Sequence, residues 1–148
     1  MKADLRWIHN MAFECNNHGI KTFTDATLDT GGEDKGPTPK ELVLNAMMGC
    51  TAMDVVSILK KMRQEIKEFK MDIEAEKTTE HPTHFKTALI NYYLTGELDA
   101  EKVKKAVDSS LTKYCGVNYM ISFTCDINFK VIVNQVEIHS GKVNFNQK

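Results

Sequence analysis

Residues 38–62 form a long, largely apolar stretch that limits the fold of this chain more than any other segment. Thr38 and Glu41 stand at the N-cap and N3 positions of a capping box, a pattern that is typical of a helix start. Residues 42–59 show no polar face, and a helix that is apolar on every side is a buried helix. We therefore expect one long helix in the centre of the protein.

The length of this helix predicts a second subunit. A helix over residues 38–62 rises about 37 Å along its axis. A compact chain of 148 residues has a radius of gyration of only about 15 Å. Because one chain has too few other elements to cover such a helix on all sides, we expect a homodimer with the helix near its shared core.

Alternating apolar and polar residues predict strands on both sides of the helix. The expected strands cover residues 3–15 (one or two strands), 20–28, 69–76, 85–95 and 124–139, the last paired with 143–145. Two further helical segments are expected, at residues 100–113 with Asp99 as N-cap and at residues 117–121. This order predicts an α+β fold with antiparallel sheets around a long buried central helix, in a single domain over residues 1–148.

Charge and composition exclude several classes of function. The net charge is −1, from 19 basic and 20 acidic residues, and neither sign is concentrated in one segment. We therefore expect no nucleic acid and no anionic membrane as a partner. Because we find no signal-peptide pattern and no run of about 18 apolar residues, we expect no membrane span and a cytoplasmic location.

Four cysteines lie far apart in the sequence: Cys15, Cys50, Cys115 and Cys125. They contain no CxxC pair, so their spacing predicts no zinc or other metal site. The glycines of residues 31–36 lack the lysine and hydroxyl residue of a phosphate loop, and we expect no cofactor. In a reducing compartment, a disulfide between these thiols is expected to be transient and catalytic.

Cys50 and Cys115 are the thiols best placed for chemistry. Cys50 lies in the centre of the long helix between small or polar neighbours, and Cys115 lies where the second helix ends. A thiolate can attack the O–O bond of a peroxide, and the sulfenic acid that forms needs a second thiol to prevent further oxidation. We expect Cys50 to attack and Cys115 to resolve, whereas Cys15 and Cys125 are expected to be inert.

A reactive Cys50 needs a positive group nearby, because it lies too far from the helix start for the helix dipole to stabilise its thiolate. Arg63 is about 20 Å further along the same helix, which excludes it within one chain. Several other cations stay open as the partner of Cys50: Arg6, His9, Lys35 and Lys40.

Two acidic residues near Cys50 have both a structural and a functional interpretation. The capping box explains Glu41 as a structural residue that contributes about 1 kcal/mol to helix stability. Glu41 could in addition orient the cation beside Cys50. Asp54 lies one helical turn after Cys50 and would be costly to bury without a partner. Its partner is expected to be a backbone group, a hydroxyl group or a cation.

The long helix resembles a known family motif. Residues 36–56 read GPTPKELVLNAMMGCTAMDVV and resemble the conserved segment of the OsmC/Ohr family, the osmotically inducible and organic hydroperoxide resistance proteins. Residues 113–117, KYCGV, resemble the second-cysteine segment of that family. The resemblance covers residues 31–127. It is nearest to the OsmC-like branch, because residues 11–30 contain no arginine and Gly116 replaces the proline of better-known members.

This resemblance implies an intertwined α+β homodimer with active sites between the subunits. It also implies a thiol-dependent peroxidase that reduces organic hydroperoxides and is recycled by a dithiol reductant. Cys50 matches the peroxidatic position and Cys115 the resolving position. Glu41 matches the glutamate that holds the catalytic arginine.

Two alternatives to a peroxidase stay open. The missing arginine and the apolar helix also fit a non-catalytic dimeric module that binds a small apolar or thiol-reactive ligand. The third interpretation is a structural dimer in which the cysteines only pack.

Overall fold

The computed structural model of the chain describes residues 1–145. Its contacts divide the chain into two compact units, Met1–Asn45 and a second unit that begins at Ala46. The helix α1, Pro39–Lys61, begins in the first unit and continues through the second.

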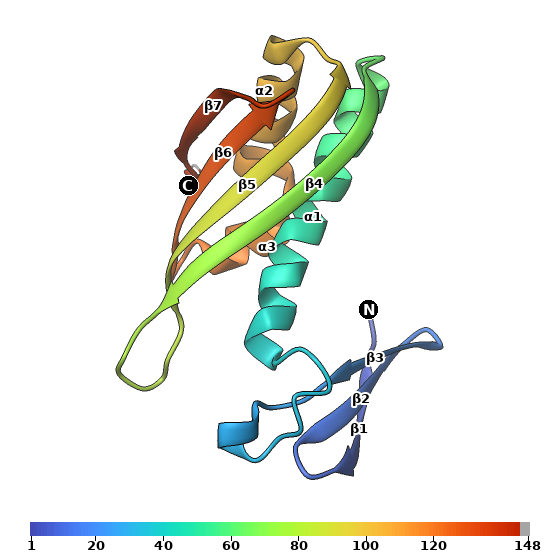
Figure 1. Cartoon of the computed structure of the whole chain (residues 1–148), viewed down its shortest axis with the longest axis vertical. Helices are drawn as coiled ribbons and strands as arrows, with labels where there is room; N and C mark the ends of the chain where they lie inside the picture. The colour runs from blue at the N-terminus through green and yellow to red at the C-terminus, as the bar shows by residue number, and fades with distance from the viewer. Residues whose placement is uncertain (146–148) are drawn as a thin grey trace. The chain divides into compact units, whose positions relative to one another are not determined.

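The first unit contains an antiparallel meander in the order β1-β2-β3, coloured blue in Figure 1. The strands are β1 (Asp4–His9), β2 (Ala12–Asn17) and β3 (Ile20–Thr24), followed by a 3-10 turn, η1 (Leu28–Thr30). Gly19 has a φ of 84°, the left-handed conformation that a tight turn between β2 and β3 requires. The strands expected over residues 3–15 are confirmed as β1 and β2, whereas the strand expected over residues 20–28 ends at Thr24.

The capping box at the start of α1 is also confirmed. The Glu41 carboxylate accepts from the Thr38 backbone N–H at 2.7 Å and from the Thr38 hydroxyl at 2.9 Å. The Glu41 N–H donates in return to the Thr38 hydroxyl oxygen at 3.4 Å. These contacts satisfy two of the backbone donors that every helix start leaves without an intrahelical partner.

Replacing Thr38 by alanine should therefore lower the free energy of unfolding by about 1 kcal/mol. Denaturant unfolding followed by circular dichroism measures this change. Glu41→Gln is the matched control, because glutamine keeps an acceptor at N3 and should retain most of the stability. An unchanged stability of Thr38→Ala would mean that the box contributes nothing to this fold.

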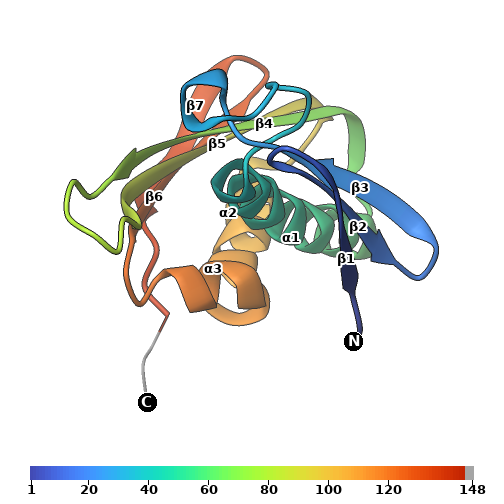
Figure 2. The same cartoon turned by 90° about the horizontal axis from the view of Figure 1, so that it is seen from below.

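The second unit is built on a four-stranded sheet in the order β4-β5-β6-β7. Its strands are β4 (Glu65–Lys77), β5 (Phe85–Glu97), β6 (Asp126–Val133) and β7 (Val136–Lys142). Three helical segments connect β5 to β6: α2 (Ala100–Ser109), the π-helical turn η2 (Ser110–Tyr114) and α3 (Gly116–Ile121). Figure 2 shows these segments on one face of the sheet.

The α+β fold is confirmed, but the sheet is mixed. Strands β5 and β6 run parallel, whereas β4–β5 and β6–β7 are antiparallel. The expected antiparallel pairing therefore holds for every strand pair except β5–β6, which is parallel because the helical connection carries the chain back to the end of the sheet from which β5 began.

Three expected elements also differ from the structure. The segment 124–139 was expected to be one strand, but Asn134 and Gln135 have positive φ values of 48° and 70° and form the turn of a β6–β7 hairpin. Residues 143–145 form no strand. The helix expected over 100–113 is α-helical only to Ser109, because the chain continues with the wider π-helical turn of η2.

The core of the second unit follows the predicted stripes. The inward residues of β5 are at most 2% exposed: Ala88, Ile90, Tyr92 and Leu94. The predicted stripe of the second helix is buried as well, over Val103, Ala106, Val107, Ser110 and Leu111. Asp99 caps α2 by accepting from the N–H groups of Glu101 and Lys102.

Helix α1 is buried along one side within the single chain. Four residues of α1 are buried within the chain, and they form one stripe: Met47, Thr51, Val55 and Leu59. The Met53 side chain, by contrast, is 75% exposed. This one-sided burial agrees with the expectation that a single chain has too few other elements to cover α1 on all sides.

The expectation that no segment is apolar enough to cross a membrane was wrong. Helix α1 reaches the length and composition of a membrane span, with a mean hydropathy of 1.7 in its most apolar part. Core helices of soluble proteins reach the same values. Within the described residues, much of the apolar surface of α1 is exposed in the single chain.

Candidate functional site

The second unit brings Cys50 and Cys115 together. Their sulfur atoms and a carboxylate oxygen of Asp54 all lie within 4.8 Å of one another. Cys50 and Asp54 are half-buried, whereas Cys115 is buried and only 1% exposed. Both thiols are free. Two cysteines from distant parts of the sequence therefore share one site with a carboxylate.

Local backbone geometry positions each of these groups. Cys50 and Asp54 are four residues apart on α1, a spacing that places both side chains on one face of the helix. Cys115 follows the π-helical turn, and its N–H donates to the Ser110 carbonyl at 2.9 Å. The Cys115 sulfur then accepts from the Asn118 N–H at 3.4 Å and caps α3. The change from α2 to α3 thus directs the Cys115 thiol toward α1.

A chain of hydroxyl groups leads from the sheet to Asp54. The Tyr92 hydroxyl lies 2.8 Å from the Thr51 hydroxyl, which lies 2.9 Å from the Ser110 hydroxyl. Ser110 also donates to a carboxylate oxygen of Asp54 at 2.9 Å. Because the Ser110 hydroxyl has one proton and the carboxylate is the stronger acceptor, we infer that Thr51 donates to Ser110 and Tyr92 donates to Thr51.

This arrangement answers the question of how Asp54 is satisfied. Of the partners considered for it, a hydroxyl group is the one present, and Ser110 supplies it. Sequence reasoning missed the roles of Thr51, Ser110 and Tyr92. The available signal was the polar character of Thr51 and Ser110 within otherwise apolar helix stripes.

Burial raises the pKa of the Cys115 thiol, and the nearby Cys50 thiol raises it further. A raised pKa leaves less thiolate at neutral pH, so Cys115 should react slowly with iodoacetamide at that pH. Its rate of alkylation should rise about tenfold per pH unit until the pH reaches the raised pKa. Peptide mass spectrometry after timed alkylation measures this rate. A rate at neutral pH equal to that of glutathione would contradict the shift.

A cleft of about 430 Å³ begins at Asp54. Basic residues Lys61 and Lys105 line it together with apolar groups of Ile58 and Tyr114. Both lysines belong to the second unit and were not among the cations considered from the sequence. The cleft could therefore hold a small ligand with an apolar part and a negative charge next to the thiol site.

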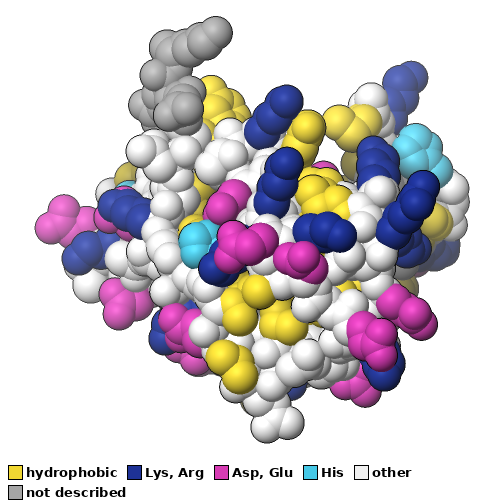
Figure 3. All heavy atoms as spheres, turned by 90° about the horizontal axis from the view of Figure 1, so that it is seen from above, with side chains coloured by type: hydrophobic (Ala, Val, Ile, Leu, Met, Phe, Trp, Pro, Cys, Tyr) yellow, Lys and Arg dark blue, Asp and Glu magenta, His cyan; other side chains and the backbone are white. Residues whose placement is uncertain are grey.

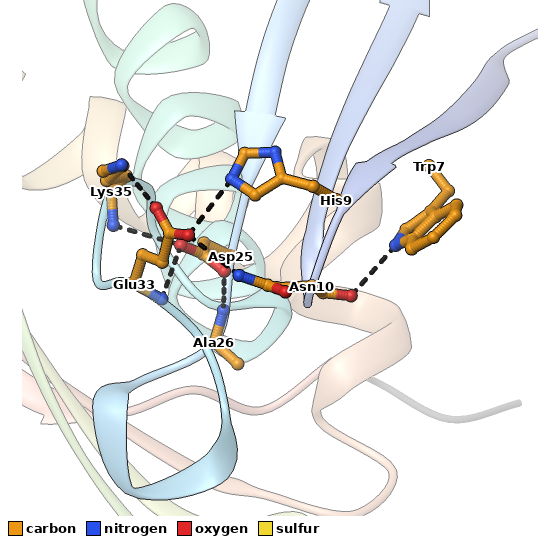
Figure 4. Close-up of polar contacts among 7 residues, drawn as sticks. All are labelled: Trp7, His9, Asn10, Asp25, Ala26, Glu33 and Lys35. Atoms are coloured by element: carbon orange, nitrogen blue, oxygen red, sulfur yellow. Dashed lines mark hydrogen bonds and ion pairs between the residues drawn. The ribbon is translucent and has the colours of Figure 1, made fainter.

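Three of the residues considered as partners of Cys50 contact carboxylates inside the first unit. Arg6 lies 3.1 Å from Glu14, His9 lies 3.3 Å from Glu33, and Lys35 also pairs with Glu33. Figure 4 shows the Glu33 carboxylate between His9 and Lys35. The hydrogen bonds from Lys35 and then His9 hold the pKa of Glu33 below its usual range.

The Asp25 carboxylate holds the loop that contains Glu33 and Lys35. The carboxylate accepts from the backbone N–H groups of Ala26, Glu33 and Lys35 at 2.8, 3.1 and 3.2 Å (Figure 4). These three hydrogen bonds lower the pKa of Asp25, and the bond from the Ala26 N–H has the largest effect. Asp25 is 4% exposed, and its contacts explain its burial as structural.

The remaining predicted site residues lie apart from the pair of thiols in the sequence. Glu41 lies in the capping box of the first unit, and its catalytic role stays a prediction. Cys15 is half-buried in β2. Cys125 is buried just before β6, and burial raises the pKa of its thiol.

On the face shown in Figure 3, basic, acidic and apolar side chains lie close together, as the near-zero net charge suggests.

Comparison with known proteins places this arrangement in a family. The model of the family described as OsmC-like protein matches residues 32–130. The Escherichia coli K12 protein YhfA is 34% identical over 131 residues, which cover 86% of this chain and 93% of YhfA.

Solved structures have the same fold. A hypothetical protein from Aquifex aeolicus VF5 is 27% identical, with a TM-score of 0.77 over 90% of this chain and 96% of its own. An organic hydroperoxide resistance protein OsmC from Legionella pneumophila is 17% identical, with a TM-score of 0.67 over 88% of this chain and 94% of its own. The second likeness supports the fold alone.

Proposed function

Because the chain belongs to the OsmC-like protein family, we propose that it is a thiol peroxidase that reduces organic hydroperoxides. Cys50 is the attacking thiol and Cys115 the resolving thiol. The observation that carries this proposal is the distance of at most 4.8 Å between their two sulfur atoms. The name of the Legionella relative, an organic hydroperoxide resistance protein, agrees with this substrate class.

The reaction balances with the two thiols and an external dithiol. The Cys50 thiolate attacks one peroxide oxygen, the O–O bond breaks, and the alkoxide takes a proton to leave as an alcohol. Cys115 then attacks the sulfenic acid on Cys50, which releases water and forms a disulfide. A dithiol reductant then reduces this disulfide in two thiol–disulfide exchange steps, which regenerate both protein thiols and oxidise the reductant to its own disulfide.

The short distance between the sulfurs supports the second step. An S–S bond is about 2.05 Å long, so side-chain rotation has to close a gap that starts at no more than 4.8 Å. Cys50 is the more accessible of the two thiols, as expected for the thiol that attacks the peroxide. Cys115 is buried, which suits a resolving thiol that reacts only with the sulfenic acid on Cys50.

A homodimer with the active sites between its subunits is part of the proposal. The exposed side of α1 supports it, as does the first unit, where large apolar side chains are exposed: Leu5, Trp7, Ile8, Ile20 and Phe23. Together the two units form one domain, and the protein acts in the cytoplasm. Sedimentation equilibrium should give the mass of two chains, and a monomer at micromolar concentration would contradict this part.

Glu41 and a cation complete the proposed site. Glu41 orients a positive group that stabilises the Cys50 thiolate, and the candidates for this group are Arg6, His9 and a lysine. Glu41→Gln separates this role from helix capping, because glutamine keeps the cap but removes the charge. We expect slower peroxide consumption at nearly unchanged stability.

Thiol counting tests the central proposal. Reduced protein is treated with one equivalent of cumene hydroperoxide, and the remaining thiols are alkylated and mapped by mass spectrometry. We expect Cys50 and Cys115 to be lost together as one disulfide, while Cys15 and Cys125 stay reduced. If Cys50 and Cys115 both stay reduced under excess peroxide, the protein is not a thiol peroxidase.

A second candidate function is ligand binding without catalysis. The cleft beside Asp54 favours it, because the cleft offers both apolar surface and two lysines. In this case Cys50→Ser should retain the ligand, and the wild-type protein should not consume peroxide.

A further inference from the structure

Against the expectation from the cysteine spacing, we propose that reduced Cys50 and Cys115, together with Asp54, form a binding site for a thiophilic divalent cation of the zinc class. The three ligand atoms lie within 4.8 Å of one another. This inference does not depend on peroxidase activity. It concerns the same thiols in a second chemical state, bound to a metal instead of oxidised.

The distances suit a single ion. Zinc binds thiolate sulfur at about 2.3 Å and carboxylate oxygen at about 2.0–2.2 Å, so ligand atoms around one tetrahedral ion lie about 3.8 Å apart or less. Atoms that start within 4.8 Å reach this geometry by small rotations of their side chains. Two thiolates and one carboxylate are also the ligand types that zinc accepts in proteins.

Neighbouring hydrogen bonds hold two of the three ligands in place. The Ser110 hydroxyl donates to Oδ2 of Asp54 at 2.9 Å. The Asn118 N–H donates to the Cys115 sulfur at 3.4 Å. Hydrogen bonds of this kind orient metal ligands in known sites and increase their affinity.

Access and charge also suit a cation. Cys50 and Asp54 are half-buried, so an ion can reach the site from solvent and keep a fourth position for water. Binding converts two thiols to thiolates and releases two protons, with no change in oxidation state. Two thiolates and a carboxylate leave one negative charge on the complex, which Lys61 and Lys105 in the adjoining cleft partly balance.

Metal binding and oxidation exclude each other at this site. A disulfide between Cys50 and Cys115 has no thiolate to offer, and a thiolate held by zinc is less available to attack a peroxide. We therefore expect bound zinc to slow the loss of the two thiols under peroxide.

Zinc titration of the reduced full-length chain tests the inference, with a chromophoric chelator as competitor. We expect one zinc ion per chain. Cys50→Ser, Cys115→Ser and Asp54→Asn should each weaken binding by about tenfold or more. Cys15→Ser is the matched control, because it also removes one thiol and should bind zinc as the wild type does.

Two further measurements do not depend on how well the variants fold. Wild-type protein oxidised with diamide should lose the zinc site and regain it on reduction. Cobalt(II) bound to wild-type protein should show intense thiolate-to-metal charge transfer, which falls by about half in each cysteine variant and persists in Asp54→Asn.

The inference is overturned if the reduced wild type binds no zinc, or if Cys15→Ser weakens binding as much as Cys50→Ser. Because no peroxide is present in the titration, its result is separate from that of the peroxidase test. A chain that binds zinc but ignores peroxide would support this site and reject the proposed function.

Discussion

Cys50→Ser should lose peroxide consumption by about a thousandfold or more, since removal of an enzyme's nucleophile leaves little of its rate. A serine hydroxyl is almost never ionised at neutral pH, so it cannot replace a thiolate in the attack on the O–O bond. Consumption of cumene hydroperoxide in the presence of dithiothreitol measures the rate. Serine is close to cysteine in size, and the melting temperature should change little.

Cys15→Ser is the control for this experiment, because it removes a thiol from β2 in the first unit. Its rate should equal that of the wild type. If Cys50→Ser consumes peroxide as fast as Cys15→Ser does, another thiol attacks, and the assignment of Cys50 is wrong.

Cys115→Ser should change the product that forms on Cys50. The first attack on peroxide needs only Cys50, so the sulfenic acid should still form. Without a partner sulfur within 4.8 Å, this acid meets further peroxide and proceeds to sulfinic and sulfonic acid. Under excess peroxide without reductant, we expect most Cys50 to gain two or three oxygen atoms in peptide mass spectra, while wild-type protein stops at the disulfide.

Cys125→Ser is the matched control for this second prediction, because Cys125 is also a buried thiol of the second unit. It should form the same disulfide as wild-type protein. Equal over-oxidation of Cys50 in wild-type protein and in Cys115→Ser would show that Cys115 does not resolve the sulfenic acid.

The local features of the fold could be predicted from the sequence. The start of α1 depends on contacts between Thr38 and Glu41, which are three residues apart, and the cap of α2 depends on Asp99 and its next neighbours. The buried stripes of β5 and α2 follow from the periods of a strand and a helix. Such features depend on residues within one turn or one strand, so they can be recognised directly in the sequence.

Longer-range features could be predicted only in part. The main apolar residues of segment 124–139 lie at odd positions up to Val133 and at even positions from Val136, so the alternation shifts at Asn134 and Gln135, a sign of the hairpin that the expectation of one strand overlooked. The parallel pairing of β5 with β6 depends on how the intervening helices cross the sheet. The all-apolar surface of α1 indicates a cover but does not distinguish between a cover from the same chain and one from a second chain.

By itself, the sequence determined which two thiols stand apart, with Cys50 on the long helix and Cys115 at the end of a helical segment. Cys125, expected within a strand, lies just before β6. Only the tertiary structure decided that Cys50 and Cys115 meet, and that they meet beside a carboxylate held by Ser110. The physical reason is that residue periodicity and capping act over a few residues. The meeting of α1 with the end of η2 depends instead on how the side chains of the whole second unit pack.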